Sequence, residues 1–288
     1  MLNSSFLFLY IILYFYIMKS LVEYILEKYN NAHKGDEFYT RLVDIEKEMK
    51  KFDFSQKVVY CNCDNPSFSN FYKYFHDNFD KLKIKMLLAT YYDDNPMLYE
   101  YDGKEEKKTK IKSGDFRDNG DVMKRCDIIV TNPPFSQGLP TDLVNMCLKY
   151  GKDFIFLCKN DWYTRKGAFD FYKNGKLNVD NVEVGKFEGP NSSTKVTCYW
   201  FTSLSVKKDS FTAKKKYSEE DYPKYKNADA IEVGAIENIP ADYDGNMGVS
   251  LSFAKYLDRN QYEIIGIVNA PVGLDGHKYY KRLIIKNK

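Results

Sequence analysis

One stretch decides the fold of this chain: Cys126-Asp127-Ile128-Ile129-Val130-Thr131-Asn132-Pro133-Pro134-Phe135. Residues 127–131 are a short apolar run that begins with an acid, which predicts a buried strand. The next four residues predict a rigid turn at the end of that strand, because proline fixes φ and offers no N–H donor.

The turn Asn132–Phe135 is suited to holding a planar amine. The side-chain carbonyl of Asn132 can accept one N–H, and a main-chain carbonyl left free by the proline run can accept another. Phe135 offers a flat apolar face on which a nucleobase can stack. The alternative is an ordinary loop, since Asn-Pro and Pro-Pro pairs mark turns in many proteins. The strand directly before the turn favours a binding site.

Strands and helices alternate around this stretch. The predicted strands span 58–61, 84–90, 127–131, 154–157, 196–204 and 262–268. Helices are predicted from about Ser69, over 167–174, and from about Thr141, with the N-cap of the last at Thr141 or Asp142. Residues 91–113 are expected to form a loop or hairpin. The alternation predicts an α/β fold with a doubly wound, mostly parallel sheet. Ligands bind at the carboxyl ends of such strands, so Asn62–Asn65 and Asn132–Phe135 are expected to face one cleft.

The amino terminus carries an apolar extension, residues 1–17. Phe6 to Met18 is an unbroken apolar run of 13 residues, shorter than the ~20 that span a bilayer. It lacks the basic segment and cleavage site of a signal peptide. A weak membrane anchor and an extension from upstream of the true start both stay open, and an amphipathic helix beginning at Met18 favours a start there. Residues 18–51 are predicted to be helical, apart from a polar turn with an exposed aromatic pair at 35–40.

Composition sets broad limits. With 288 residues, 44% of them hydrophobic, the chain can form one large α/β domain with a substantial appendage. The net charge of +3 is too small to imply a polyanionic partner by itself. Six cysteines without the paired spacing of a zinc site indicate reduced core thiols in a cytosolic protein, and no metal.

Basic and aromatic residues are interleaved beyond residue 205. Residues 205–226 contain seven lysines and four acidic residues, a local net charge of +3. Lysines beside tyrosines suit contacts with a phosphate backbone and nearby bases, although a solvated surface loop is the alternative. The candidate DNA-binding residues are Lys207, Lys208, Lys214, Lys215, Lys216 and Lys224.

Together these segments resemble the EcoRI-type family of adenine-specific DNA methyltransferases. The resemblance runs from about residue 20 to 270 and is carried by Asp36–Thr40, Cys61–Pro66, Ser69–Phe75, Gly114–Phe116, Asn132–Phe135, Trp200–Thr202, Tyr222–Tyr225, Asp229–Val233, Asp242–Gly245, Met247–Val249 and Gln261–Gly266. The Asn-Pro-Pro-Phe turn is shared by many amino-methyltransferases, whereas Cys61–Pro66 and the carboxyl-terminal segments are more specific. The glycine-rich loop of the wider superfamily is replaced by Asp64, Asn65 and Pro66, which can themselves shape a turn.

The resemblance implies a class I S-adenosylmethionine-dependent methyltransferase fold, with a catalytic domain at 18–204 and a target-recognition region at 205–288 packed on it. It implies methyl transfer from S-adenosylmethionine to N6 of a flipped-out adenine in double-stranded DNA. The implied setting is a restriction-modification system or an orphan enzyme, with a GAATTC-like site. The implied catalytic residues are Asn132, Pro133, Pro134 and Phe135. The implied cofactor contacts are Tyr39, Thr40, Cys61, Asn62, Asp64, Asp115, Phe116 and Asn132.

The resemblance also implies individual roles. Asn132 would accept an N6 proton through its side-chain carbonyl, and Pro133 another through its main-chain carbonyl. Asp64 would hold the ammonium group of the cofactor. Asp115 would accept from the adenine amine of the cofactor, with Phe116 beside that ring.

Two other classes of function stay open. An RNA or protein (glutamine) amino-methyltransferase would use a very similar turn. A non-catalytic DNA-binding module would explain the missing glycines. In every case we expect a cytoplasmic monomer without an obligate protein partner.

Overall fold

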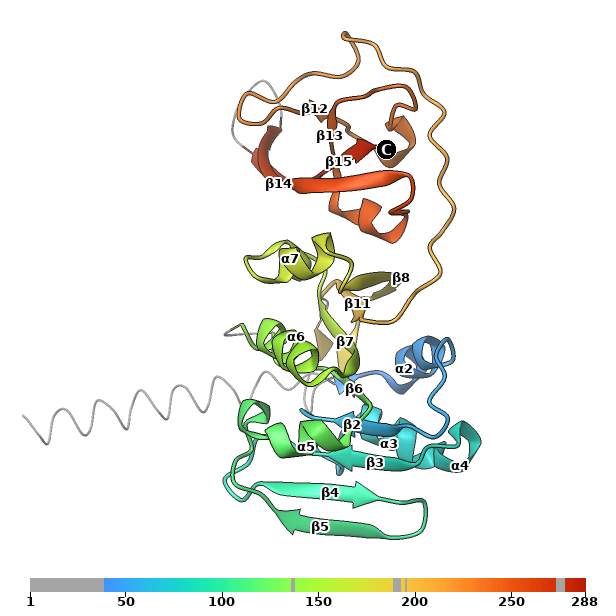
Figure 1. Ribbon diagram of the computed structural model, residues 1–288, viewed down its shortest axis with the longest axis vertical. Coiled ribbons are helices and arrows are strands. Elements are labelled where there is room, and N and C mark those ends of the chain that lie inside the picture. The colour runs from blue at the N-terminus through green and yellow to red at the C-terminus, as the bar shows by residue number, and fades with distance from the viewer. Residues whose placement is uncertain (1–38, 136–137, 189–192, 195, 273–277) are drawn as a thin grey trace, which may run out of the picture.

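The computed structural model describes residues 39–135, 138–188, 193–194, 196–272 and 278–288. An eight-stranded sheet forms its centre, in the order β5-β4-β3-β2-β6-β7-β11-β8 (Figure 1). Only β4 and β11 run against their neighbours, so the other six strands point the same way. The strands are β2 (Val58–Cys61), β3 (Met86–Ala89), β4 (Met97–Tyr101), β5 (Glu106–Lys110), β6 (Ile128–Thr131), β7 (Asp153–Lys159), β8 (Asn178–Val184) and β11 (Cys198–Thr202).

Helices cover both faces of this sheet. The residues of the parallel strands β3-β2-β6-β7 are mostly apolar and buried, as expected for strands covered on both sides. Val59 and Cys61 pack with one layer of helices, whereas Tyr60 packs with the other. The first layer is α2 (Leu42–Met49), α3 (Asn70–Asp77) and α4 (Phe79–Leu82), and the second is α5 (Gly120–Arg125), α6 (Leu139–Tyr150) and α7 (Ala168–Lys173). The predicted doubly wound, mostly parallel α/β fold is confirmed.

Helix starts agree only in part with the sequence pattern. Ser69 caps α3, because its hydroxyl accepts hydrogen bonds from the N–H groups of Phe71 and Tyr72. α6 begins at Leu139, directly after Gly138 at φ +77°, so the N-cap expected at Thr141 or Asp142 was wrong. The first turn of α6 tolerates a proline, whose missing N–H would have no partner there.

The predicted loop or hairpin at 91–113 is a hairpin of β4 and β5. β5 forms one edge of the large sheet, and all five of its residues are exposed. Three of the five are lysines, Lys107, Lys108 and Lys110.

A second sheet follows the first along the chain, with the order β12-β13-β15-β14. Its strands are β12 (Ile231–Glu232), β13 (Asn246–Ser250), β14 (Tyr262–Val272) and β15 (Lys278–Asn287). β14 and β15 pair as a long antiparallel hairpin, of which the sequence pattern predicts only 262–268. The sheet lies in a separate lobe at one end of the molecule (Figure 1).

Shorter elements complete the described chain. A three-stranded sheet contains β1 (Tyr39–Thr40), β9 (Phe187–Glu188) and β10 (Ser193–Thr194), and the short 3-10 helices are η1 (Phe116–Asp118), η2 (Trp162–Thr164), η3 (Ile236–Asn238) and η4 (Leu251–Lys255). The apolar run Phe6–Met18 lies outside the described residues. Within those residues, no helix has both the length and the apolar character needed to cross a membrane.

Three charged groups join α2 to β8 inside the protein. Glu48 is fully buried, and the Lys51 ammonium donates hydrogen bonds to Glu48 Oε2 and to Asp180 Oδ1, each at 2.8 Å. Burial, followed by the nearby negative charge of Asp180, raises the pKa of Glu48 to about 7.

We expect Glu48→Gln to remove part of the pH dependence of stability. Because the folded-state pKa of Glu48 lies above its ordinary value of 4.5, folding takes up a proton, and stability falls as the pH rises from about 4.5 through about 7. The wild type should therefore lose on the order of 1–3 kcal/mol more than the variant between pH 5 and 8. Urea unfolding at several pH values measures this, and parallel pH curves for the two proteins would contradict it.

Candidate functional site

A buried carboxylate joins three elements at the carboxyl edge of the large sheet. Asp64 lies in the loop after β2, and its side chain is almost fully buried. Its Oδ1 accepts a hydrogen bond from the Ser69 hydroxyl at 2.6 Å, and its Oδ2 accepts one from the Thr131 hydroxyl at 2.7 Å. The loop after β2, the N-terminus of α3 and the last residue of β6 are therefore held together directly before Asn132.

The protonation of Asp64 reflects two opposing effects. Burial raises the pKa of this carboxyl to about 6, and the hydrogen bonds from Ser69 and Thr131 partly offset that rise. Both oxygens already accept a hydrogen bond within the protein. The structure thus gives Asp64 a bridging position that the sequence pattern does not predict.

The turn at Asn132–Phe135 comes directly after Thr131, whose hydroxyl binds Asp64. Asn132 is half-buried, Pro133 is buried and Pro134 is exposed. The two proline rings fix the φ angles of the turn. Phe135 is half-buried, and its ring meets the ring of Phe187 edge-on, with 6.5 Å between the centroids. The contact with Phe187 fixes one edge of Phe135.

Thr40 reaches the same region from the start of the described chain. β1 pairs with β9, which places Thr40 opposite Phe187, and the Asn70 side chain donates to the Thr40 carbonyl at 2.8 Å. The expected polar turn at 35–40 was therefore wrong at its end, since Tyr39 is half-buried and Thr40 is buried. The strand pairing with β9 is the physical reason.

Two buried polar side chains here are unsatisfied within the described residues. Neither amide atom of Asn62 has a hydrogen-bond partner in that part of the chain, and the Thr40 hydroxyl has none there either. Each such group costs on the order of 1–3 kcal/mol. Groups of this kind point to a ligand with its own donors and acceptors.

Cys61 takes a position different from the one expected of a cofactor contact. Its side chain is buried in the core with Phe71 and Trp200, and burial raises the pKa of its thiol. Its carbonyl accepts a hydrogen bond from the Thr90 N–H at 3.1 Å. The side chain of Cys61 is thus part of the core.

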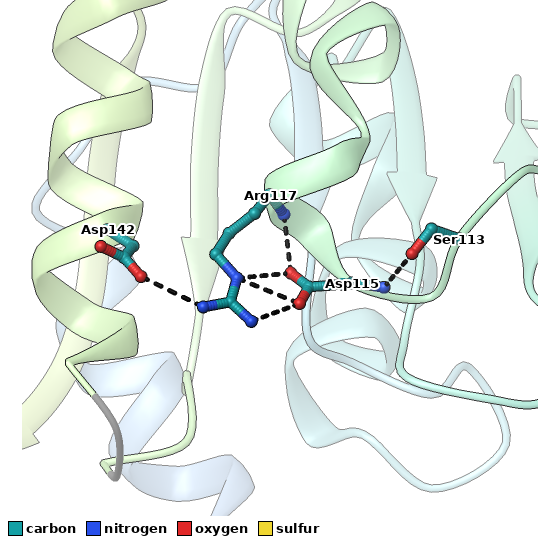
Figure 2. Close-up of polar contacts among 4 residues, drawn as sticks. All are labelled: Ser113, Asp115, Arg117 and Asp142. Atoms are coloured by element: carbon teal, nitrogen blue, oxygen red, sulfur yellow. Dashed lines mark hydrogen bonds and ion pairs between the residues drawn. The ribbon is translucent and has the colours of Figure 1, made fainter.

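Asp115 and Phe116 lie beside the loop that follows β3. Gly114 approaches that loop so closely that an added Cβ would lie 2.7 Å from the backbone nitrogen of Asp93. Asp115 caps η1, and Arg117 binds its carboxylate at distances of 2.5–3.0 Å (Figure 2). The Arg117 guanidinium therefore holds the pKa of Asp115 below its usual range. Phe116 is buried in the core.

Arg117 also connects this segment to α6. Its guanidinium lies 3.4 Å from the carboxylate of Asp142. Figure 2 shows that Arg117 lies between Asp115 and Asp142. The Asp115 oxygens expected to accept from a cofactor amine are therefore already engaged by a neighbouring cation.

The lysines expected to bind DNA fall into two groups. Five are exposed: Lys207, Lys214, Lys215, Lys216 and Lys224. Lys208 instead turns inward and donates to the main-chain carbonyls of Val179 and Ala254, so its binding to DNA stays a prediction. Burial lowers the pKa of Lys208 to about 8.

Sequence reasoning missed the residues that support the turn. Thr131, Asn70 and Phe187 connect the expected site residues to one another. Thr131 carried a usable signal, since it is the one hydroxyl residue in the apolar run 128–131.

The sequence is similar to those of known methyltransferases. The profile of a family described as "Adenine-specific methyltransferase EcoRI" matches residues 26–113, 102–196 and 179–288. Type II methyltransferase M.EcoRI of Escherichia coli is 35% identical, over 88% of this chain and 94% of its own. Two Mycoplasma relatives are 30% and 32% identical, each over 83% of this chain and 84% of its own: M.MgeORF184P of Mycoplasma genitalium and M.MpnI of Mycoplasma pneumoniae. The chain belongs to the EcoRI-type family of adenine-specific methyltransferases.

Proposed function

We propose that this protein is a site-specific DNA methyltransferase that methylates N6 of adenine, with S-adenosylmethionine as the methyl donor. Family membership supports the reaction class. The observation that carries the proposal is the buried bridge from Asp64 to Thr131, which fixes the Asn132–Phe135 turn next to the loop after β2. We further propose that residues 18–204 form the catalytic domain and 205–288 the target-recognition region.

The residues present fit the cofactor. S-Adenosylmethionine carries an ammonium group, a carboxylate, ribose hydroxyls and an adenine amine, so it offers both donors and acceptors. Asn62 and the Thr40 hydroxyl would meet these groups, since both are buried and lack partners within the described residues. When bound, the cofactor supplies an electrophilic methyl group on its sulfonium. Tyr39 and Phe116 would flank the bound cofactor. Asp115 would contact the cofactor as part of its ion pair with Arg117 and not as a single carboxylate.

Asn132 and Pro133 would orient the acceptor amine. The Asn132 side-chain carbonyl and the Pro133 main-chain carbonyl would each accept an N–H from N6. Two fixed acceptors direct the nitrogen lone pair and favour the partly cationic nitrogen of the transition state. No covalent enzyme intermediate is needed.

Phe135 would receive the extruded base. Removing an adenine from the duplex costs a few kcal/mol, and stacking on an aromatic ring returns roughly 1–3 kcal/mol. Because Phe187 supports the edge of Phe135, the ring is held in place before the base arrives. The five exposed lysines would neutralise backbone phosphates around the recognised site.

The relatives favour DNA over the RNA and protein-glutamine alternatives, because their names describe type II methyltransferases. Tritium transfer from labelled cofactor to duplex DNA, RNA and protein acceptors separates these reactions. Calorimetry with S-adenosylmethionine tests the non-catalytic alternative, and methylome sequencing of an expressing host identifies the target. A cytoplasmic monomer acting on a GAATTC-like site remains a prediction.

Asn132→Ala should lower the rate of methyl transfer by about 10²–10³-fold, because one fixed acceptor is lost. Cofactor affinity, measured by calorimetry, should change little. Asn132→Asp keeps an acceptor oxygen and should retain more activity than the alanine variant. Normal turnover by Asn132→Ala would remove this residue from the mechanism.

Phe135→Ala should weaken capture of the flipped base by the roughly 1–3 kcal/mol of one stacking contact. Steady-state kinetics with duplex DNA should show this as a lower kcat/KM, while Phe135→Trp preserves a stacking face and most of the activity. Equal kcat/KM for the alanine variant and the wild type would argue against stacking.

Replacing Lys214, Lys215 and Lys216 by Gln should weaken DNA binding in a salt-dependent manner. If each contacts one phosphate, the slope of log K against log salt falls by about 3. Fluorescence anisotropy from 50 to 200 mM salt measures the slope. An unchanged slope would assign these lysines to a solvated surface.

A further inference from the structure

A cavity of ≈ 540 Å³ lies between the catalytic sheet and the second lobe. Its wall combines Tyr172 and Asn178 from the catalytic side with Lys208 from the connecting segment and Arg259 from the second lobe. The segment that carries Lys208 runs between the two sheets along the side of the molecule (Figure 1). None of the mechanism proposed above uses this cavity.

Two cations share the wall of this cavity. Lys208 is half-buried, and its ammonium donates to the carbonyls of Val179 and Ala254, the latter at 3.3 Å. The Arg259 guanidinium donates to the Lys173 carbonyl at 3.0 Å and to the Tyr172 carbonyl, and it lies 5.2 Å from the centre of the Tyr172 ring. Both side chains are thus held in fixed positions by the main chain.

Their positive charges are close enough to affect each other. Burial is the main cause that lowers the pKa of Lys208 to about 8, and the charge of Arg259, whose effect is smaller than the opposing effect of Asp180, lowers it further. Asp180 acts in the opposite direction but already binds Lys51. Placing two like charges on one partly buried wall is unfavourable unless anions compensate them.

The carboxylates of the described residues act on these two cations only from a distance. Within the described residues, neither Lys208 nor Arg259 forms an ion pair with a carboxylate. Of the two acids on the wall, Asp209 is exposed, and Asp258 accepts the N–H of Asn260 at 2.8 Å. Tyr172 on the same wall is buried, and its hydroxyl has no hydrogen-bond partner in the described chain.

We propose that this cavity binds a phosphate group, held by Lys208 and Arg259. A tetrahedral oxyanion would accept hydrogen bonds from both cations and neutralise their repulsion. Because Lys208 belongs to the connecting segment, Arg259 to the second lobe and Tyr172 to the catalytic side, the bound group would join all three. Free phosphate and a phosphate of the DNA backbone share this chemistry. The site is independent of the methyl-transfer proposal.

Thermal unfolding with sulfate, which does not titrate near neutral pH, tests the site. At constant ionic strength, 10 mM sulfate should raise the Tm of the wild type above its value in chloride. Lys208→Met and Arg259→Met should lose the rise, whereas the exposed neighbour Lys207→Met should keep it. The rise should shrink from pH 7 to 9 as Lys208 loses its proton; the other charged groups around it are Arg259, Asp180, Asp209 and Asp258.

Duplex DNA distinguishes the two sources of phosphate. If the DNA backbone fills the site, Lys208→Met lowers the salt slope of DNA binding by about 1, and saturating DNA abolishes the sulfate effect. If a free anion fills it, the slope stays unchanged and the sulfate effect persists with DNA. Equal Tm values in sulfate and chloride, together with an unchanged slope, would overturn the proposal. Asn132→Ala should keep the sulfate effect, so a failure of the proposed methyl transfer remains distinguishable.

Discussion

The site depends on one buried carboxylate that accepts hydrogen bonds from two hydroxyl groups. Asp64 sits where β2 ends, Ser69 where α3 begins and Thr131 where β6 ends. In most nucleotide-binding folds a glycine-rich loop lets the backbone approach the ligand at this position. Here side chains shape the loop instead, and the same contacts that shape it also fix the turn at Asn132. The geometry of this loop and the geometry of the Asn132–Phe135 turn are therefore coupled.

Much of the sheet could be predicted, because its parallel strands are short apolar runs that each end in polar or turn-forming residues. The rigid turn at Asn132–Phe135 was equally predictable, since proline limits the backbone wherever it occurs. What the sequence could not supply were pairings between distant segments. From the sequence, Thr40 is expected in a turn and Asp115 is expected to be an unpaired acid. In the structure, Thr40 pairs with β9 and Arg117 binds Asp115. Lys208 lies among exposed lysines in the sequence, yet in the structure it is half-buried between the two lobes and donates to a main-chain carbonyl.

Besides a shared apolar core, the lobes are joined by side chains that donate to main-chain carbonyls. The Tyr163 hydroxyl donates to the Leu251 carbonyl at 2.8 Å, and Lys173 donates to the Ile265 carbonyl at 3.0 Å. A carbonyl is present whatever residue occupies the position. The second lobe can therefore change its outward side chains without losing these hydrogen bonds.

The lysine-rich strand β5 has a consequence for encounters between copies of this protein. The outer edge of any open sheet offers unpaired N–H and C=O groups to which a strand of another molecule can add. A second chain docking against Lys107, Lys108 and Lys110 would bring like charges together and strip their hydration. The lysine side chains of β5 thus discourage the large sheets of two molecules from joining edge to edge.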